Sequence, residues 1–131
     1  MRNLFAALIV MMSATGLAGE YEDAVAAYEN GDHGNAVALY QKAAEKGDVR
    51  AQKDLGWLYF KGRGVPQDYV AAFRWYKMAA EQGDAKGKTQ LGLMYEDGLG
   101  VQPDYNEAYR WYRMAVEQGD VGGRLYLGQM Y

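Results

Sequence analysis

Small and apolar residues recur at spacings of three and four along most of this chain, the spacing of one buried stripe on an α-helix. One such stripe consists of Ala51, Leu55, Leu58 and Tyr59. After a short polar segment a second stripe follows, and its members are Ala72, Trp75, Tyr76, Ala79 and Ala80. The pattern therefore predicts two amphipathic helices, each burying one face against its neighbours.

The segment between the two stripes, residues 62–68, has the composition of a loop. Gly62 and Gly64 allow the positive φ angles that end a helix, and Pro66 fixes the direction of the chain. Asp68 stands where a side-chain oxygen caps the start of the second helix. A Gly-x-Gly sequence also occurs in phosphate-binding loops, but such loops follow a strand, and none is predicted here. We therefore expect a turn between antiparallel helices.

The helix–loop–helix pattern is repeated along the chain. Residues 48–83 and 84–119 are identical at 18 of 36 positions when they are aligned without gaps. A shortened copy precedes them within residues 19–47, and a further copy begins in residues 120–131. A fixed period of this length indicates stacked helix pairs, so we expect an all-α solenoid with these four segments as its units.

The segment that precedes the repeats, residues 1–18, follows a different pattern. A basic start is followed by nine consecutive apolar residues, 4–12, and then by small residues that include Gly16 and Ala18. This order is typical of a secretory signal peptide, with cleavage expected after Ala18. An uncleaved anchor is the alternative, although the apolar run covers less than half of a roughly 30 Å hydrocarbon core. We expect no stable membrane span after cleavage and a periplasmic or secreted protein.

Composition narrows the possible chemistry. The formal charge is −3, so the chain lacks the basic excess that nucleic-acid binding requires. It contains no cysteine and one histidine, His33, which argues against a disulfide framework, a metal site and a histidine-based triad. We expect no cofactor and no catalytic residue.

The aligned residues resemble those of a known family. The string Leu-Gly-x-x-Tyr-x-x-Gly-x-Gly-Val, followed by Asp-Tyr, Ala, Trp-Tyr and Glu-Gln-Gly, is similar to the Sel1-like repeat, a relative of the tetratricopeptide repeat. Residues 48–119 match in two full copies, whereas residues 19–47 are closer to a tetratricopeptide repeat. The resemblance implies a short right-handed superhelical solenoid of antiparallel helix pairs that binds a protein or peptide on its concave face.

The resemblance leaves alternative functions open. The protein could be a cell-envelope regulator or a toxin-neutralising protein, which would also act by binding. A cysteine-rich branch of the family has reported activity against β-lactams, and a hydrolase acting on a β-lactam or cell-wall substrate is therefore another alternative. This sequence lacks those cysteines, and an enzyme would need carboxylates that converge, for instance Glu96 and Asp97.

Residues that differ between aligned repeats are the candidates for partner binding. In this family the first helix of each unit lines the concave side, and side chains outside its buried stripe are free to make contacts. Aromatic residues ringed by basic ones form an expected binding surface for a segment with some acidic character. The set is Tyr28, Arg50, Lys53, Trp57, Phe60, Lys61, Lys86, Thr89, Leu93, Glu96 and Asp97. The alternative is that these side chains cover loops or the adjoining helix.

The last segment, residues 120–131, supplies one helix of a unit without its partner helix. Leu125, Leu127 and Met130 leave one side of that helix apolar. Three interpretations follow: a capping helix, a chain cut short, or a surface that joins another copy or a partner. An oligomer formed through this helix is therefore possible.

Overall fold

The computed structural model describes residues 19–131. The predicted signal peptide, residues 1–18, lies outside the described residues. Within the described part, no helix combines the length and the apolar character needed to cross a membrane.

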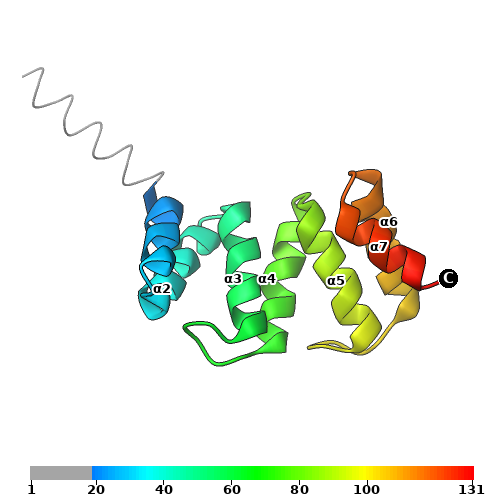
Figure 1. Cartoon of the computed structure of the whole chain (residues 1–131), viewed down its shortest axis with the longest axis horizontal. Helices are drawn as coiled ribbons and strands as arrows, with labels where there is room; N and C mark the ends of the chain where they lie inside the picture. Colours follow the sequence, from blue (N-terminus) through cyan, green and yellow to red (C-terminus); the bar gives the residue numbers. More distant parts are fainter. Residues whose placement is uncertain (1–18) are drawn as a thin grey trace, which may run out of the picture.

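Helices joined by short loops make up the described chain (Figure 1). The first covers residues 19–29, and the described residues contain no strand. The others are α2 (His33–Glu45), α3 (Val49–Lys61), α4 (Tyr69–Glu81), α5 (Ala85–Asp97), α6 (Tyr105–Glu117) and α7 (Val121–Gln129). The prediction of an all-α repeat solenoid is confirmed.

Aspartates set where the helices begin. An aspartate is the N-cap of every helix from α2 to α7, and its carboxylate accepts backbone N–H groups of the first turn. At the other end of α3 and α5, the φ angles of Gly62 and Gly98 are 70° and 69°. This left-handed conformation is the one expected of a glycine that ends a helix. The capping function predicted for Asp68 is confirmed, because its carboxylate accepts the N–H of Ala71 at 3.0 Å.

Packing between units follows from small residues and aromatic rings. Helices α3 and α4 pack together within one unit, as do α5 and α6, while α2 packs on α3 and α4 on α5 across the unit boundaries. The second glycine of each long loop, Gly64 or Gly100, packs closely against the preceding unit. A side chain at Gly64 would meet the backbone of His33, and one at Gly100 would meet the backbone of Tyr69. Each loop therefore rests against the start of the preceding unit's second helix.

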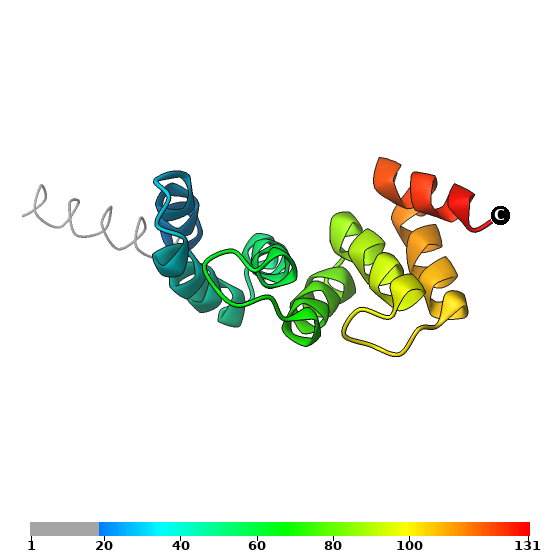
Figure 2. The same cartoon turned by 60° about the horizontal axis from the view of Figure 1, so that its bottom comes forward.

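The stacking gives the molecule two unequal sides. In Figure 2 helix 19–29, α3, α5 and α7 lie along the upper, inner side of a curved array, with α2 and α4 below them. Trp111 is 8% exposed and belongs to the core, and Trp75 packs half-buried against the buried residues of the N-terminal units, as the stripe pattern predicts for both. The first helix of each unit therefore lies on this inner side.

Candidate functional site: a groove along the first helices

Three adjoining pockets follow the first helices from one end of the array to the other, and we call them together the groove. The pocket nearest the N-terminus, the aromatic pocket, has a volume of 170 Å³ and opens between helix 19–29, α2 and α3. Its lining residues are Tyr28, Tyr40, Asp54, Trp57 and Leu58. Aromatic rings and one carboxylate therefore dominate its surface.

The middle pocket lies between α3 and α5. It has a volume of 310 Å³ and shares Asp54 and Trp57 with the aromatic pocket. Its other lining residues are Lys53, Tyr76, Lys86 and Gln90. Two lysines therefore give this pocket positive charge that the aromatic pocket lacks.

The third pocket lies between α5 and α7. It has a volume of 320 Å³ and shares Lys86 and Gln90 with the middle pocket. Its other lining residues are Thr89, Asp120, Gly122 and Tyr126. Because neighbouring pockets share residues, the groove is continuous over three repeat units.

Aromatic rings form one wall of the aromatic pocket. The Tyr28 ring stacks on His33 at 4.5 Å between centroids and meets Trp57 edge-on at 6.1 Å. Arg63, from the Gly-x-Gly loop, places its guanidinium carbon 5.6 Å from the Trp57 ring centroid and donates a hydrogen bond to the Tyr28 hydroxyl at 3.3 Å. The aromatic pair therefore already contacts one cation of the chain itself, at the loop edge.

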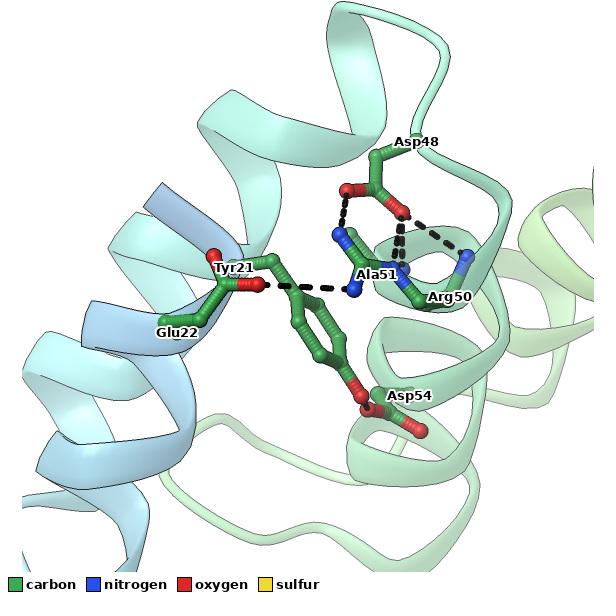
Figure 3. Close-up of polar contacts among 6 residues, drawn as sticks. All are labelled: Tyr21, Glu22, Asp48, Arg50, Ala51 and Asp54. Carbon is green, nitrogen blue, oxygen red and sulfur yellow. Dashed lines mark hydrogen bonds and ion pairs between the residues drawn. The ribbon is translucent and has the colours of Figure 1, made fainter. Parts of the chain in front are cut away.

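Asp54 is the charged group that the aromatic and middle pockets share. The Tyr21 hydroxyl donates to its Oδ2 at 2.8 Å (Figure 3). Burial raises the pKa of Asp54 above its ordinary value, and the negative charges of Asp84 and Asp48 act in the same direction. The hydrogen bond from Tyr21 and the charge of Lys53 oppose that rise without cancelling it. Asp54 is therefore a carboxylate with incomplete charge compensation.

Arg50 joins the first two units and does not line the groove. Its guanidinium lies 2.9 Å from Asp48 and 3.4 Å from Glu22, and it covers the Tyr21 ring at 4.2 Å (Figure 3). Hydrogen bonding from Arg50 lowers the pKa of Asp48. Arg50 was predicted as a partner-binding residue, but its charge is already engaged by two carboxylates of the chain.

Apart from Arg50, the predicted binding residues fall into two groups in the structure. Tyr28, Lys53, Trp57, Lys86 and Thr89 line the groove. Thr89 is only 5% exposed, and its hydroxyl donates to Asp120 Oδ2 at 2.7 Å, so it joins α5 to the cap of α7. We therefore leave Thr89 and Arg50 out of the surface that a partner would contact.

The second group lies toward the loop ends of α3 and α5. Phe60 packs edge-on against Tyr69 at 5.2 Å, and the Lys61 ammonium lies 5.8 Å from the Phe60 ring centroid. Glu96 accepts a hydrogen bond from the Tyr112 hydroxyl at 2.9 Å. Leu93 is half-buried, and Asp97 is exposed at the end of α5. None of these five residues lines the three pockets described.

Two pairs of residues illustrate why the prediction missed part of the lining. Asp54 and Gln90 occupy the same position of adjacent repeats and differ, so the rule that selected Lys53 and Trp57 could also have found them. Tyr40 and Tyr76 occupy the same position of adjacent units, and Tyr76 was predicted as a member of a buried stripe. Both are nearly buried, at 5% and 2% exposed, yet each forms part of a pocket floor.

The site offers binding surface and no assembled metal centre. Across residues 19–131 no group of three or more histidine, aspartate or glutamate side chains is placed to hold a metal ion. Aromatic rings, two lysines, one amide and two carboxylates make up most of the lining. Such a lining suits contact with an extended molecule along several units.

Fold and groove together define a solenoid of helical-pair repeats with a surface along its first helices. The family model of the Sel1 repeat matches residues 17–48, 49–84 and 85–120. The chain therefore belongs to the Sel1 repeat family, as the resemblance in the sequence predicted. Proteins of this family are generally protein-interaction modules. Comparison with curated proteins gives no match.

Solved structures of similar proteins support the same assignment. A protective antigen of uropathogenic Escherichia coli strains, which displays an SLR fold, is 40% identical over 88% of this chain, with a TM-score of 0.83. A Sel1 repeat protein from Oxalobacter formigenes is 33% identical over 85% of this chain, with a TM-score of 0.77. The chain spans 26% and 44% of the lengths of these two proteins, respectively.

A third similar structure is the cysteine rich protein B of Helicobacter pylori. It is 25% identical, with a TM-score of 0.66, and the match covers 71% of this chain and 70% of that protein. The present chain contains no cysteine. The two therefore share the repeat architecture but not the cysteine content for which that protein is named.

Proposed function

We propose that this protein is an exported interaction module that binds a segment of another polypeptide in the groove. The observation that carries this proposal is the continuity of the three pockets along helices whose lining residues differ between repeats. Residues that match in phase are needed for stacking in both repeats. The differing residues Asp54, Trp57 and Gln90 line the pockets and so are available for recognition, although Trp57 also packs against both core clusters.

The groove favours a peptide over a small molecule. Each pocket is open and holds 170 to 320 Å³, and the three lie in line over three repeats. An extended peptide places successive side chains in such a row, whereas a small ligand is usually enclosed in one concave site. We expect the two lysines of the middle pocket to contact an acidic or carbonyl group of the segment.

Export is the other part of the proposal. The apolar run at residues 4–12 and the small residues after it support a periplasmic or secreted location. A secretion reporter fused to residues 1–18 tests this location, and cytoplasmic retention of the reporter would contradict it.

Selection of peptides from a displayed random library on the purified protein tests the groove. We expect enriched peptides to lose about tenfold or more in affinity for Trp57→Leu and for Lys86→Glu, measured by fluorescence anisotropy. Leucine is suitable at position 57 because Leu93 occupies the same position of the next repeat. Circular dichroism establishes that both variants remain helical.

A matched control removes an aromatic side chain elsewhere. Tyr105 is 67% exposed at the start of α6 and lines none of the three pockets described, so Tyr105→Ala leaves peptide affinity unchanged. Peptides that bind Trp57→Leu and Lys86→Glu as tightly as the parent protein would overturn the assignment of the groove. Failure to enrich any peptide would overturn the choice of an unstructured polypeptide segment as the ligand.

A further inference from the structure

The aromatic pocket differs in chemistry from the other two pockets of the groove. Three of its five lining residues are aromatic, namely Tyr28, Tyr40 and Trp57. Its one charged lining residue is Asp54, and neither lysine of the middle pocket is among its lining residues. Aromatic rings beside a carboxylate form an environment that attracts a cation.

We propose that the aromatic pocket is a subsite for the cationic side chain of a lysine or arginine in the bound polypeptide segment. This inference rests on the proposed function and adds the chemistry of one side chain to it. The carboxylate of Asp54 supplies the charge, and Tyr28, Tyr40 and Trp57 supply contact with the alkyl stem and the cationic head.

The volume of the pocket suits such a side chain. The aromatic pocket measures 170 Å³. For comparison, an apolar cavity of about 150 Å³ holds a benzene molecule. A lysine side chain has four methylene groups and one ammonium, which is close to that size. The pocket opens to the groove, so the stem enters from a backbone that lies along α3.

Asp54 is placed and charged to receive the cation. Its Oδ2 accepts the Tyr21 hydroxyl, which fixes the carboxylate and leaves Oδ1 to accept a further N–H donor. Asp84 and Asp48 increase the negative potential at Asp54, while Lys53 reduces it and Arg50 is engaged with Asp48. A bound ammonium or guanidinium would supply the compensation that Asp54 lacks, because charge-assisted hydrogen bonds to a partly buried carboxylate are strong.

The chain itself shows that the aromatic pair accepts a cation. Arg63 lies 5.6 Å from the Trp57 centroid and bonds to the Tyr28 hydroxyl, yet it is exposed and is not among the residues that line the pocket. It therefore occupies the loop edge and leaves the interior free. The next repeat offers no equivalent subsite, since Gln90 and Leu93 replace Asp54 and Trp57.

Titration with single amino-acid probes tests the subsite without any partner. The probes are Nα-acetyl-lysine methylamide and Nα-acetyl-arginine methylamide, and the uncharged control is Nα-acetyl-norleucine methylamide. The readout is the indole N–H resonance of Trp57 in ¹⁵N–¹H spectra, which Trp57→Leu identifies by removing it. We expect saturable shifts with a dissociation constant in the millimolar range and a preference of about tenfold over norleucine. The tighter of the two cationic probes identifies the preferred side chain.

Two variants test whether binding of the cationic probe depends on the charge of Asp54. Asp54→Asn preserves the size of the side chain and should weaken binding of the cationic probe about tenfold. Asp97→Asn, which changes an exposed acid outside the pocket, should leave that binding unchanged. Norleucine binding equal to lysine, cationic binding that survives Asp54→Asn, or no saturable shift would each overturn the subsite.

Failure of the cationic subsite can be distinguished from failure of the groove as a polypeptide site. Peptides that bind the groove but tolerate replacement of every lysine and arginine by norleucine would overturn the subsite alone. Probe binding that depends on Asp54, in a protein that enriches no peptide, would overturn the groove as a polypeptide site and leave the subsite standing.

Discussion

Helices α3 and α5 occupy the same position in adjacent repeats, yet they present different chemistry to the groove. Both place a leucine and a glycine, Leu55-Gly56 and Leu91-Gly92, in the buried stripe, and both end at a glycine with a positive φ. On the inner side, α3 carries Asp54 and Trp57 where α5 carries Gln90 and Leu93. One scaffold thus holds two surfaces. Two of the differing residues also join the units, because Trp57 packs on both core clusters and Asp54 accepts the Tyr21 hydroxyl.

The polar contacts that α3 and α5 make with neighbouring units also differ. Helix α3 is tied to the preceding unit by Arg50, which contacts Asp48 and Glu22 at the surface. Helix α5 is tied to the following one by the buried hydroxyl of Thr89 on Asp120. Polar contacts at unit boundaries therefore vary from repeat to repeat, whereas the glycine and aromatic contacts recur.

The largest effect is expected at the loop glycines that both repeats share. Gly100 has a φ of 71°, and a side chain there would meet the Tyr69 backbone. Because Gly100→Ala combines an unfavourable backbone conformation with this overlap, we expect a loss of about 3 kcal/mol in the free energy of unfolding. Urea denaturation followed by circular dichroism measures it.

Gly83→Ala is the control for this prediction. Gly83 also has a positive φ, of 102°, but there is open space where the new side chain would stand. Only the backbone conformation then disfavours alanine, and we expect a smaller loss, on the order of 1 kcal/mol. Equal losses for Gly100→Ala and Gly83→Ala would show that the loop does not lock the units together.

A smaller difference in stability is expected between alanine substitutions at Gly56 and Gly92, which occupy the same position of α3 and α5. A methyl group at Gly92 would overlap the Tyr112 ring, which is fully buried and bonded to Glu96. At Gly56 the nearest atoms, on the Tyr76 ring, are 3.1 Å away. Because alanine favours helix by about 1 kcal/mol over glycine, we expect Gly92→Ala to cost roughly 1 kcal/mol and Gly56→Ala to be close to neutral. Thermal melts of the two variants compare them directly, and equal melting temperatures would refute the difference in packing.

The smallest effect is expected at Lys53, which occupies the same position as Thr89 in the preceding repeat. Thr89→Val keeps the volume but removes the hydroxyl bond to Asp120. We therefore expect a loss of about 1 kcal/mol and faster hydrogen exchange in α7. Lys53 lies half-buried on the groove. Lys53→Met should accordingly change stability by less than about 0.5 kcal/mol. If α7 exchanges at the parent rate in Thr89→Val, the proposed tie between α5 and α7 is absent.

The repeat pattern allowed the sequence to predict the fold and part of the groove. Loop ends and caps could be predicted because Gly62 and Asp68 act on their immediate neighbours. Tyr28, Lys53, Trp57 and Lys86 were found because they lie outside the buried stripe, although Tyr28 and Trp57 also pack half-buried against the core. The pairing of Arg50 with Glu22 could not be predicted, because Glu22 lies in another helix at a separation that no helical period encodes. The apolar end of α7 stays a prediction, and Leu125 there is 59% exposed.

The amino-acid sequence by itself determined the helices, their caps and the order in which the units stack, since these depend on local spacing and on side chains repeated every 36 residues. Only the tertiary structure decided that Tyr28, Tyr40 and Trp57 meet around Asp54. These four residues come from three helices of two units, and the angle between the units sets their distances. That angle results from the packing of many side chains at once, which no single repeat encodes.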